Sequence, residues 1–485
     1  MLFEEIDIIE TYHNYFNILI YTMKLLRYML ILLILLITMI FVIPYFINNK
    51  GVEQLGIFDK INFSLLYLKY YKRGLVGFRK NDTVYLEKSL SNDPLAVHFF
   101  RNIQNNYKNG VAVIDTYIQK FYVVANPSIL KHMYKNSPNI FGPSIMKKFF
   151  FGNIMPENIG VTECPYSKAK ICKEYQDKRD MNEEIFKTNK KIDYYDLMES
   201  SICNNITKKI EHSNNMKEIA TNILMDLFFG HKSNELKALL YNNYDFVDVD
   251  SDISLKTIYS KLFDSRSNMK KITKYIYEHD MGYSIFGMYK DYEKSHNIKF
   301  DLSNEIPHWI GPVGFIIQFY FPILLDSVLR RKDVYDKLMA EINSGILNLN
   351  SKTSYIHYCV VEFFRLYNII FIQAVRKCLT DITIDGVFFS KNSEILTNTS
   401  TLLRDEKEFP NSSHFIPERW EHKSIEDQHI NFGFGTQRCP SINFTPLLYK
   451  ILLKHVLSNY NYKLKKQYNT NEVPEWKNGY EISFD

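Results

Sequence analysis

The chain has 485 residues, of which 46% are hydrophobic and 23% charged, a composition typical of a folded protein with a large core. Its net charge is only +5 and it has no dense run of Lys and Arg, so nothing favours a nucleic-acid partner. The six cysteines show neither a CxxC pair nor a zinc-type spacing, which argues against a disulfide framework and predicts mostly buried thiols in a reducing compartment: Cys164, Cys172, Cys203, Cys359, Cys378 and Cys439.

The first predicted element is an apolar segment. Residues 28–47 read YMLILLILLITMIFVIPYFI and carry no formal charge, and a helix of this length spans roughly 30 Å, the hydrocarbon thickness of a bilayer. Asn48, Asn49 and Lys50 follow in place of the small-residue cleavage site of a signal peptide. We therefore predict an N-terminal segment at 1–27 and a retained transmembrane anchor at 28–47.

The distribution of basic residues predicts the orientation of this anchor. Lys and Arg continue after the span, at Lys50, Lys60, Lys69, Lys72 and Arg73, which favours a cytosolic C-terminal part. We predict a single-pass protein with a cytosolic catalytic domain in an endoplasmic-reticulum-like membrane, or in a host membrane if the source is a virus.

The rest of the chain shows no repeat, low-complexity linker or Pro/Gly-rich break, which predicts one domain over residues 60–485. Helical patterns dominate, for example at 333–342 and 355–366. Strand-like stretches are short, at 111–118, 121–125 and 382–389, and the last contains the hairpin signal Asp385-Gly386. The sequence predicts a mainly α domain with small β-sheets.

The strongest chemical motif is FGFGTQRCP, from Phe432 to Pro440. Its glycines permit a tight turn, so the thiolate of Cys439 can approach a flat macrocycle closely. A following helix would favour the anionic sulfur, and a thiolate donates electron density to haem iron. By itself, a cysteine beside a glycine turn is more commonly a buried structural residue.

Two further segments precede this loop. Glu362-Phe363-Phe364-Arg365 places both charges on one face of a helix, and FIPERW, from Phe415 to Trp420, comes shortly before the cysteine. In this order and spacing, the three segments resemble the signature of the cytochrome P-450 family, and the resemblance extends roughly from residue 109 to residue 464. It implies the cytochrome P-450 fold, haem b with Cys439 as axial iron ligand, and a buried salt-bridge triad of Glu362, Arg365 and Arg419.

The resemblance also implies residues that bind the haem propionates. Arg376 matches an arginine that usually contacts a propionate, although a surface arginine is the alternative. Tyr166 and Lys170, an aromatic and a cation one turn apart, stand where the family often has an aromatic–arginine pair, and a plain exposed helix is the alternative there.

The Cys loop departs from the family pattern at three positions. Gln437 replaces the usual arginine, which moves the cation to Arg438, and Ser441 replaces a glycine. Pro446 falls inside the expected following helix, where a proline normally costs about 3 kcal/mol.

A larger departure concerns oxygen activation. Counting back from the helix at 333–342 places the family's acid–alcohol pair near Phe315 and Ile316, neither of which can relay a proton. Gln318 is the nearest polar side chain. The resemblance therefore leaves the catalytic residues unknown.

Three functions remain open at this point. The first is a monooxygenase that oxidises an apolar, lipid- or sterol-like substrate with O2 and electrons from an NADPH-dependent reductase. The second is an O2-independent isomerase, dehydratase or peroxygenase acting on a lipid hydroperoxide, and the third is a degenerate, non-catalytic haem-binding protein. A basic face for the reductase is predicted near the cysteine, from Lys168, Lys170, Lys173, Lys178, Arg438, Lys450 and Lys454.

Overall fold

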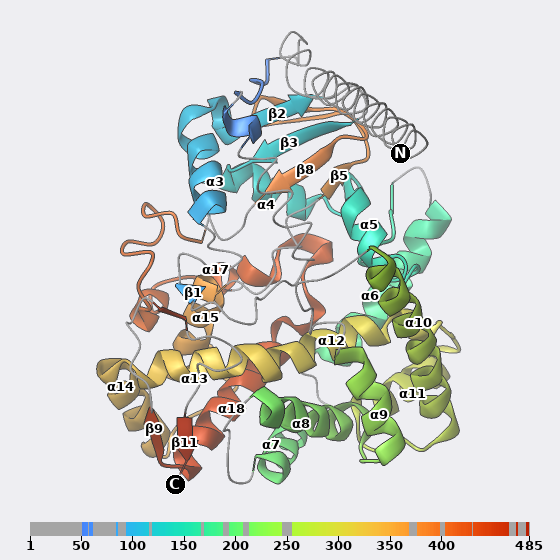
Figure 1. Ribbon diagram of the computed structural model, residues 1–485, viewed down its shortest axis with the longest axis vertical. Helices are drawn as coiled ribbons and strands as arrows, with labels where there is room; N and C mark the ends of the chain where they lie inside the picture. Colours follow the sequence, from blue (N-terminus) through green and yellow to red (C-terminus); the bar gives the residue numbers. More distant parts are fainter. Residues whose placement is uncertain are drawn as a thin grey trace, which may run out of the picture.

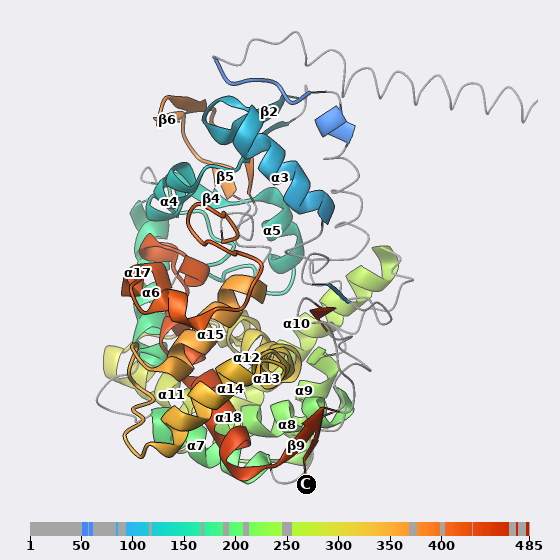
Figure 2. The same cartoon turned by 90° about the vertical axis from the view of Figure 1, so that its left-hand side faces the viewer.

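The computed structural model describes residues 51–56, 58–61, 84–85, 94–115, 119–165, 169–187, 194–206, 213–244, 255–367, 376–397, 403–428, 430–464, 472–473 and 482–484. They form a small β-rich part and a larger helical part at opposite ends of the long axis (Figure 1 and Figure 2). Helices dominate and the sheets are small, which confirms the fold class predicted from the sequence at this level.

The largest sheet has five strands in the order β2-β3-β8-β5-β4. β3 pairs antiparallel with β2 and parallel with β8, so the N-terminal strands are joined to a segment from far along the chain. The amide of Leu55 donates to the carbonyl of Val113 at 2.9 Å, which covers the outer edge of β2. The strands are β2 (Val111–Asp115), β3 (Lys120–Val124), β4 (Phe141–Pro143), β5 (Arg376–Cys378) and β8 (Glu394–Thr397).

A two-stranded hairpin follows the predicted signal. β6 (Ile382–Ile384) pairs antiparallel with β7 (Val387–Phe389). Asp385 and Gly386 between them have φ angles of 49° and 76°, both in the left-handed region that a type I′ turn requires. The hairpin prediction is confirmed. Two shorter ladders join β1 (Val84–Tyr85) to β10 (Glu472–Val473) and β9 (Tyr462–Leu464) to β11 (Ile482–Phe484).

The helical elements begin and end where local sequence signals allow. For example, Asn126 caps α4 by accepting hydrogen bonds from the amides of Ser128 and Ile129, with Pro127 in the first turn. In chain order the helices are α3 (Pro94–Asn106), α4 (Pro127–Lys135), α5 (Ile145–Phe151), α6 (Ala169–Phe186), α7 (Tyr194–Asn205), α8 (Ser213–Leu224), α9 (Asn234–Tyr244), α10 (Leu255–Glu278), α11 (Ile285–His296), α12 (Ile306–Phe315), α13 (Phe321–Leu329), α14 (Lys332–Asn343), α15 (Tyr355–Tyr367), α17 (Ile425–Gln428) and α18 (Phe444–Asn459). Helices α14 and α15 confirm the predictions at 333–342 and 355–366.

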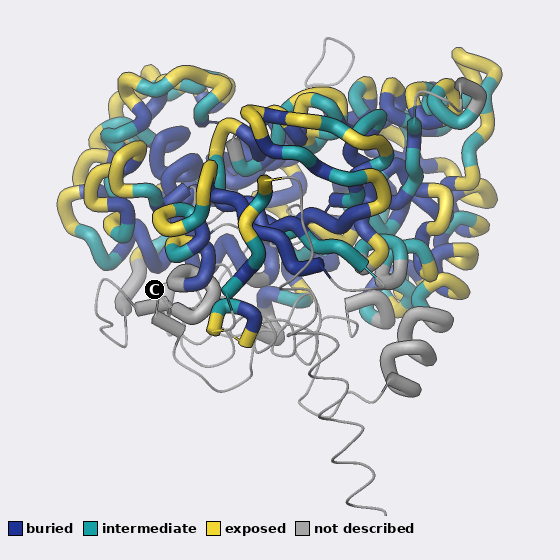
Figure 3. The backbone as a smooth tube through the Cα atoms, turned by 90° about the horizontal axis from the view of Figure 1, so that it is seen from above, coloured by how far each residue is buried: buried dark blue, intermediate teal, exposed yellow. Residues whose placement is uncertain are grey.

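The largest hydrophobic core lies in the helical part and joins α6 to α8, α10 to α13, α15 and α18. The tube in Figure 3 shows buried backbone along the inner segments and exposed positions on the outer turns. Every residue from Ile356 to Tyr367 is buried, so α15 is a core helix on all sides. A smaller core packs against the five-stranded sheet.

A long helical run crosses this core. α12 is followed directly by the π-helix η7 (Ile316–Tyr320) and then by α13 (Figure 1). Within the part of the chain that the structure describes, one run, Leu302–Leu329, is long and apolar enough to cross a membrane, and 88% of its apolar window is buried in the protein. It is the central core helix of the helical part.

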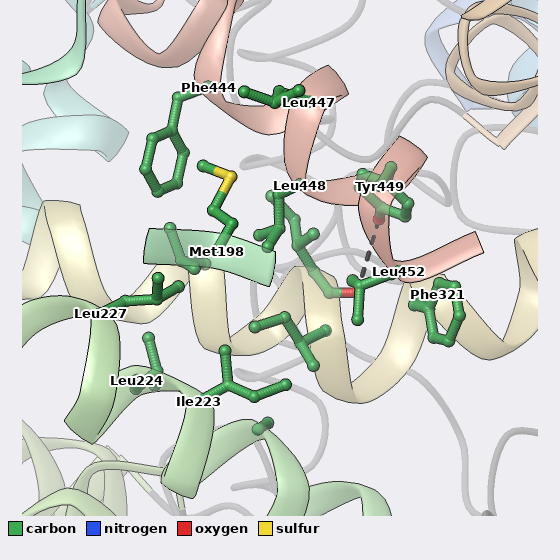
Figure 4. Close-up of a cluster of buried hydrophobic side chains, with 14 of the residues drawn as sticks. Met198, Ile223, Leu224, Leu227, Phe321, Phe444, Leu447, Leu448, Tyr449 and Leu452 are labelled. Atoms are coloured by element: carbon green, nitrogen blue, oxygen red, sulfur yellow. Dashed lines mark hydrogen bonds between the residues drawn. The ribbon is translucent and has the colours of Figure 1, made fainter. Parts of the chain in front are cut away.

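α18 packs directly against this run. Figure 4 shows Phe444, Leu448 and Tyr449 of α18 beside Met198 of α7 and Phe321 of α13. The hydroxyl of Tyr449 donates to the carbonyl of Ile316 at 3.4 Å. This carbonyl also accepts the amide of Phe321, which closes the π-helical turn.

Pro446 does not interrupt α18. The helix begins at Phe444, so Pro446 is its third residue, and the first four amides of a helix have no partner within the helix. The expected penalty of about 3 kcal/mol for a proline in a helix interior therefore does not apply.

Two cysteines depart from the sequence prediction. Cys164 and Cys172 are joined by a disulfide, with Cα atoms 5.0 Å apart across a separation of eight residues, a distance that permits a bridge. Cys359 and Cys378 are buried thiols as predicted, whereas Cys203 is exposed. The predicted segment 1–27 and the anchor at 28–47 lie outside the described residues.

Candidate functional site

The loop before Cys439 is closed by its own backbone. The amide of Cys439 donates to the carbonyl of Phe432 at 2.7 Å, and Gly433 and Gly435 have φ angles of 76° and 69°. A Cβ atom at Gly435 would lie 2.9 Å from the Cα of Lys135 in α4, so only glycine permits this close approach. The glycine pattern therefore serves two needs, a left-handed backbone and contact with α4.

Polar groups of the same loop surround the sulfur. The Sγ of Cys439 lies 3.1 Å from the Oγ of Ser441, and Thr445 of α18 donates to that same Oγ at 3.1 Å. Burial raises the pKa of the Cys439 thiol, while the hydroxyl and amide of Ser441 act in the opposite direction by hydrogen bonding to the sulfur.

The ExxR segment forms a buried ion pair in α15. The side chains of Glu362 and Arg365 are both 0% exposed, and two parallel hydrogen bonds of 2.9 and 2.8 Å join them. Arg419, from the 3-10 helix η9 (Pro417–Trp420), donates from Nε to the same carboxylate at 3.0 Å. The structure thus brings together the three residues of the predicted triad.

The triad also collects backbone and indole groups from the segment that leads to the Cys loop. Arg365 donates to the carbonyls of Leu403, Ser412 and His414 at 2.8, 2.7 and 3.1 Å. The carboxylate of Glu362 accepts the amide of Ile416 and the indole N–H of Trp420, each at 2.9 Å. Because the polar groups satisfy one another, this buried charge can hold the segment in place.

Four nitrogen-bearing side chains gather near the cysteine, from α5, α6, α12 and β5. Burial lowers the pKa of Lys147 to about 7, with Arg376 contributing in the same direction. Burial also lowers the pKa of His308 to about 4, helped by Lys147 and Arg179, so this imidazole is neutral near pH 7. Arg179 also acts on the Cys439 thiol, which places the group next to the Cys loop.

This group fits an anionic ligand. Arg179 and Arg376 are only 4% and 6% exposed, and Glu183 is the carboxylate that pairs with Arg179. Among the described residues Lys147 forms no ion pair, and the Nδ1 of His308 has no hydrogen-bond partner. Buried cations require compensating negative charge, which the two propionates of a haem beside Cys439 would supply.

The match to a known protein family lies in the C-terminal third of the chain. The family model described as Cytochrome P450 matches residues 323–482, which include the triad and the Cys loop. This part of the chain is similar to the cytochrome P-450 family. It is 30% identical over 155 residues to cytochrome P450 3A12 of Canis lupus familiaris and 25% identical over 170 residues to a probable mitochondrial cytochrome P450 12c1 of Drosophila melanogaster. Each match covers 30% of this chain, and the chain spans about a third of each relative, 31% and 32%.

The fold likeness extends further than the sequence likeness. A retinoic acid bound cyanobacterial CYP120A1 aligns with a TM-score of 0.60 over 80% of this chain and 94% of its own, at 14% identity. This identity supports the fold alone. The likeness in fold covers far more of the chain than the part that the family model matches.

The two arginines predicted to bind the haem propionates differ in their exposure. Arg376 is buried on β5, with its guanidinium 5.3 Å from the ring centre of Tyr134, whereas Arg438 is 50% exposed and lies 3.9 Å from Glu183. Tyr166 lies outside the described residues, and the side chain of Lys170 is not among those described.

A second aromatic–cation pair on α6 was missed by the sequence analysis. Tyr175 and Arg179 have the same spacing as Tyr166 and Lys170, and both are buried. Burial raises the pKa of Tyr175, while Arg179 and Arg376 act against this shift, so the ring lies close to both guanidinium groups. The repeated spacing was the available signal, but it did not indicate which pair faces inward.

The central helix has one accessible stripe. His308 and Phe315 are half-buried and Gly311 and Pro312 are exposed, in a helix whose other side is buried. These positions follow the i, i+3, i+4, i+7 pattern of a single helix face. His308 is the titratable side chain on this stripe, and the sequence analysis did not single it out.

The positions expected for the acid–alcohol pair lie at the end of α12. Phe315 is its last residue and Ile316 begins the π-helix, where it is buried. Gln318 is also buried, and its Oε1 has no hydrogen-bond partner among the described residues.

The basic face predicted for a reductase is smaller in the structure. Lys450 is 3% exposed and donates to the carbonyl of Ser351 at 3.1 Å, so it cannot form part of a surface. Lys178 donates to the carbonyl of Glu157 at 2.7 Å, and Lys454 lies 3.7 Å from Glu199. The prediction was wrong for Lys450 because it lies on a helix with a wide buried face.

Proposed function

We propose that the chain is a haem-thiolate monooxygenase of the cytochrome P-450 type, which binds haem b through Cys439 and oxidises an apolar, lipid- or sterol-like substrate. The observation that carries the proposal is the convergence of a glycine-turn cysteine, a buried triad behind it and buried cations beside it. A thiolate-ligated haem supplies the activation of an O–O bond. The residues of the chain position that group and control its surroundings.

The roles proposed for the cations follow from their burial. Arg179 and Arg376 hold the propionates as hydrogen-bond donors, and Lys147 adds a third cation. Tyr175 packs beside both guanidinium groups. The half-exposed Arg438 has a weaker hold on the haem and contributes to the outer face of the loop. Tyr166 and Lys170 remain candidates for the same role.

The triad of Glu362, Arg365 and Arg419 acts indirectly, through the backbone that leads to the Cys loop. They bind the backbone of the segment before the Cys loop and so fix the direction of the sulfur. Their role is positioning, because none of the three contacts Cys439 in the hydrogen bonds of the described residues.

The proposed substrate, reductase and membrane partners follow from the exposed residues and from the apolar N-terminal segment. The accessible stripe of α12 is mostly apolar, which suits an apolar substrate. An NADPH-dependent reductase would supply electrons from the Cys side, where Arg438 is exposed. The apolar segment 28–47 would hold the protein as a single-pass protein in an endoplasmic-reticulum-like membrane.

One observation favours a second function, an isomerase, dehydratase or peroxygenase that takes a lipid hydroperoxide. No carboxylate or hydroxyl side chain occurs on the accessible stripe of α12 at positions 308, 311, 312 and 315. A hydroperoxide already carries its O–O bond and proton, so it needs less proton delivery than O2. The neutral His308 could then accept a proton, and the amide of Gln318 could hydrogen-bond to the substrate or to a water molecule.

The test of the proposal is the absorbance spectrum of the reduced, carbon-monoxide-bound protein. We expect the wild type to show the red-shifted Soret band of a thiolate complex and Cys439→Ala to lose it, because no other described thiol lies in such a glycine turn. Cys203→Ala is the matched control, since that thiol is exposed and remote in the sequence. A red-shifted band that persists in Cys439→Ala would refute the assignment.

A further inference from the structure

Ser441 stands two residues after the cysteine, where the cytochrome P-450 pattern usually has glycine. Its hydroxyl adds a polar side chain directly beside the sulfur, with 3.1 Å between Oγ and Sγ. This distance is that of a hydrogen bond to sulfur.

The direction of this hydrogen bond is set by Thr445. Thr445 is buried as the second residue of α18, and its hydroxyl donates to the Oγ of Ser441 at 3.1 Å. The Ser441 oxygen therefore already accepts one proton, and its own proton is left to point elsewhere. Among the described residues, the Cys439 sulfur is the side-chain acceptor within hydrogen-bond distance of the Ser441 hydroxyl.

We propose that Ser441 donates a hydrogen bond to the Cys439 thiolate, that Thr445 orients it, and that the pair lowers the electron donation of the sulfur to haem iron. The inference rests on the proposed haem-thiolate function and deepens it. Ser441 acts through Cys439, so it is a positioning residue that tunes the axial ligand.

The physical consequence is a shift in redox balance. A hydrogen bond to a ligating sulfur withdraws negative charge from it, and hydrogen bonds to ligands are one of the means by which a protein sets an iron potential. The reduced iron is then favoured, while the push that cleaves an O–O bond is weaker. The stripe of α12 without carboxylate or hydroxyl acts in the same direction on reduced O2, because it lacks side chains that would deliver a proton to it.

The test compares four full-length, haem-loaded proteins: the wild type, Ser441→Gly, Thr445→Val and Ser441→Thr. The readouts are the iron–sulfur stretching frequency by resonance Raman and the haem reduction potential. We expect Ser441→Gly to raise the frequency and move the potential to more negative values. Thr445→Val keeps its shape but frees the Ser441 proton to rotate, so it should shift both quantities in the same direction by less. Ser441→Thr keeps the hydroxyl and should restore values close to those of the wild type.

The outcomes separate this inference from the proposed function. Thiolate-type spectra in all four proteins with unchanged frequency and potential would overturn the inference and leave the proposed function standing. Absence of a thiolate-type spectrum from the wild type itself would overturn both. If Ser441→Gly does not fold, Thr445→Val alone must show the negative shift, and no shift in that variant would overturn the inference.

Discussion

Glu305 is a fully buried carboxyl at the start of the central helix. Its Oε2 accepts hydrogen bonds from Asn158 and Asn182 at 2.9 and 3.3 Å, and its Oε1 has no partner among the described residues. Burial raises its pKa to about 7, against the opposing effects of Asn182 and the charge of Lys178. The ionised form is therefore disfavoured in the folded protein.

This pKa predicts a pH-dependent stability. The folded pKa of about 7 exceeds the ordinary value of 4.5, so the folded state binds more protons between these values. Its contribution to the free energy of unfolding is complete below pH 4.5, falls as pH rises through 7, and amounts to at most about 3 kcal/mol.

The stability of Glu305→Gln relative to the wild type should therefore increase as pH rises from about 4.5 to about 7, and this difference should stay constant at higher pH. The measurement is the difference in free energy of unfolding between the two proteins at several pH values. Taking the difference between the two proteins removes the contribution of His308 to the pH dependence. His308 lies one turn away, and its lowered pKa changes the stability with pH in the opposite direction. Glu157→Gln, an exposed neighbour of Lys178, is the matched control, and an equal pH dependence in both variants would contradict the assignment to Glu305.

The residue scale also shows what sequence can supply at this site. Glu362 and Arg365 were predictable because they lie three residues apart in the sequence. Cys439 was predictable because the glycines of its turn lie next to it in the sequence. The acceptors of Arg365 were not, since they are the carbonyls of Leu403 and Ser412, and a backbone carbonyl leaves no trace in the sequence. The role of Tyr175 and Arg179 likewise depends on which face of α6 is buried, and sequence spacing does not specify that face.

At the scale of the element, the sequence predicts regular structure better than its interruptions. The turn at Asp385-Gly386 and the extents of α14 and α15 follow from local patterns. The π-helix at Ile316–Tyr320 does not follow from a local pattern, and the carbonyl of Ile316 accepts a hydrogen bond from Tyr449 of a distant helix. The prediction that Pro446 would destabilise the helix was wrong, because the sequence did not show that α18 begins only two residues earlier. A proline in the first turn of a helix has little effect on its stability.

The same element carries a prediction about coupling to O2. With Phe315 and Ile316 in place of the acid–alcohol pair, reductase-driven turnover should be slow and release peroxide, while a supplied hydroperoxide should react faster. Phe315→Glu combined with Ile316→Thr should raise the product formed per NADPH consumed, because positioned acid–base groups typically contribute about 10²–10⁴-fold.

A matched variant separates chemistry from packing. Ile316→Val reduces the side chain without adding a hydroxyl, so it should leave the coupling unchanged. Tight coupling in the wild type, together with no response to hydroperoxide, would show that a proton relay exists elsewhere in the protein.

At the scale of the whole molecule, the site is assembled from distant parts. Arg376 reaches the site from the five-stranded sheet, Arg179 from α6 and His308 from the central helix, and Gly435 contacts α4 directly. The sequence could predict the strands at 111–118 and 121–125 but not their partners, because long-range pairings such as that of β3 with β8 have no local pattern. The fold likeness over 80% of the chain supplies what the sequence likeness lacks.

The last prediction concerns the apolar segment 28–47, and the fold determines where the chain can be cut. Leu55 is buried, and residues 53–55 hydrogen-bond to Val113 at the edge of β2, so a truncation should end before Gly51. Removing residues 1–49 should shift the protein from the membrane fraction towards the soluble fraction and leave its haem content unchanged, because about 20 apolar residues are lost and no described contact is. Removing residues 1–58 is the matched control: it deletes Leu55 as well, and loss of a buried leucine typically costs about 2–5 kcal/mol, so this protein should bind less haem. The measurement is haem per protein in each fraction after sedimentation. A protein lacking residues 1–49 that stays wholly in membranes would show that another surface, and not the apolar segment, holds it there.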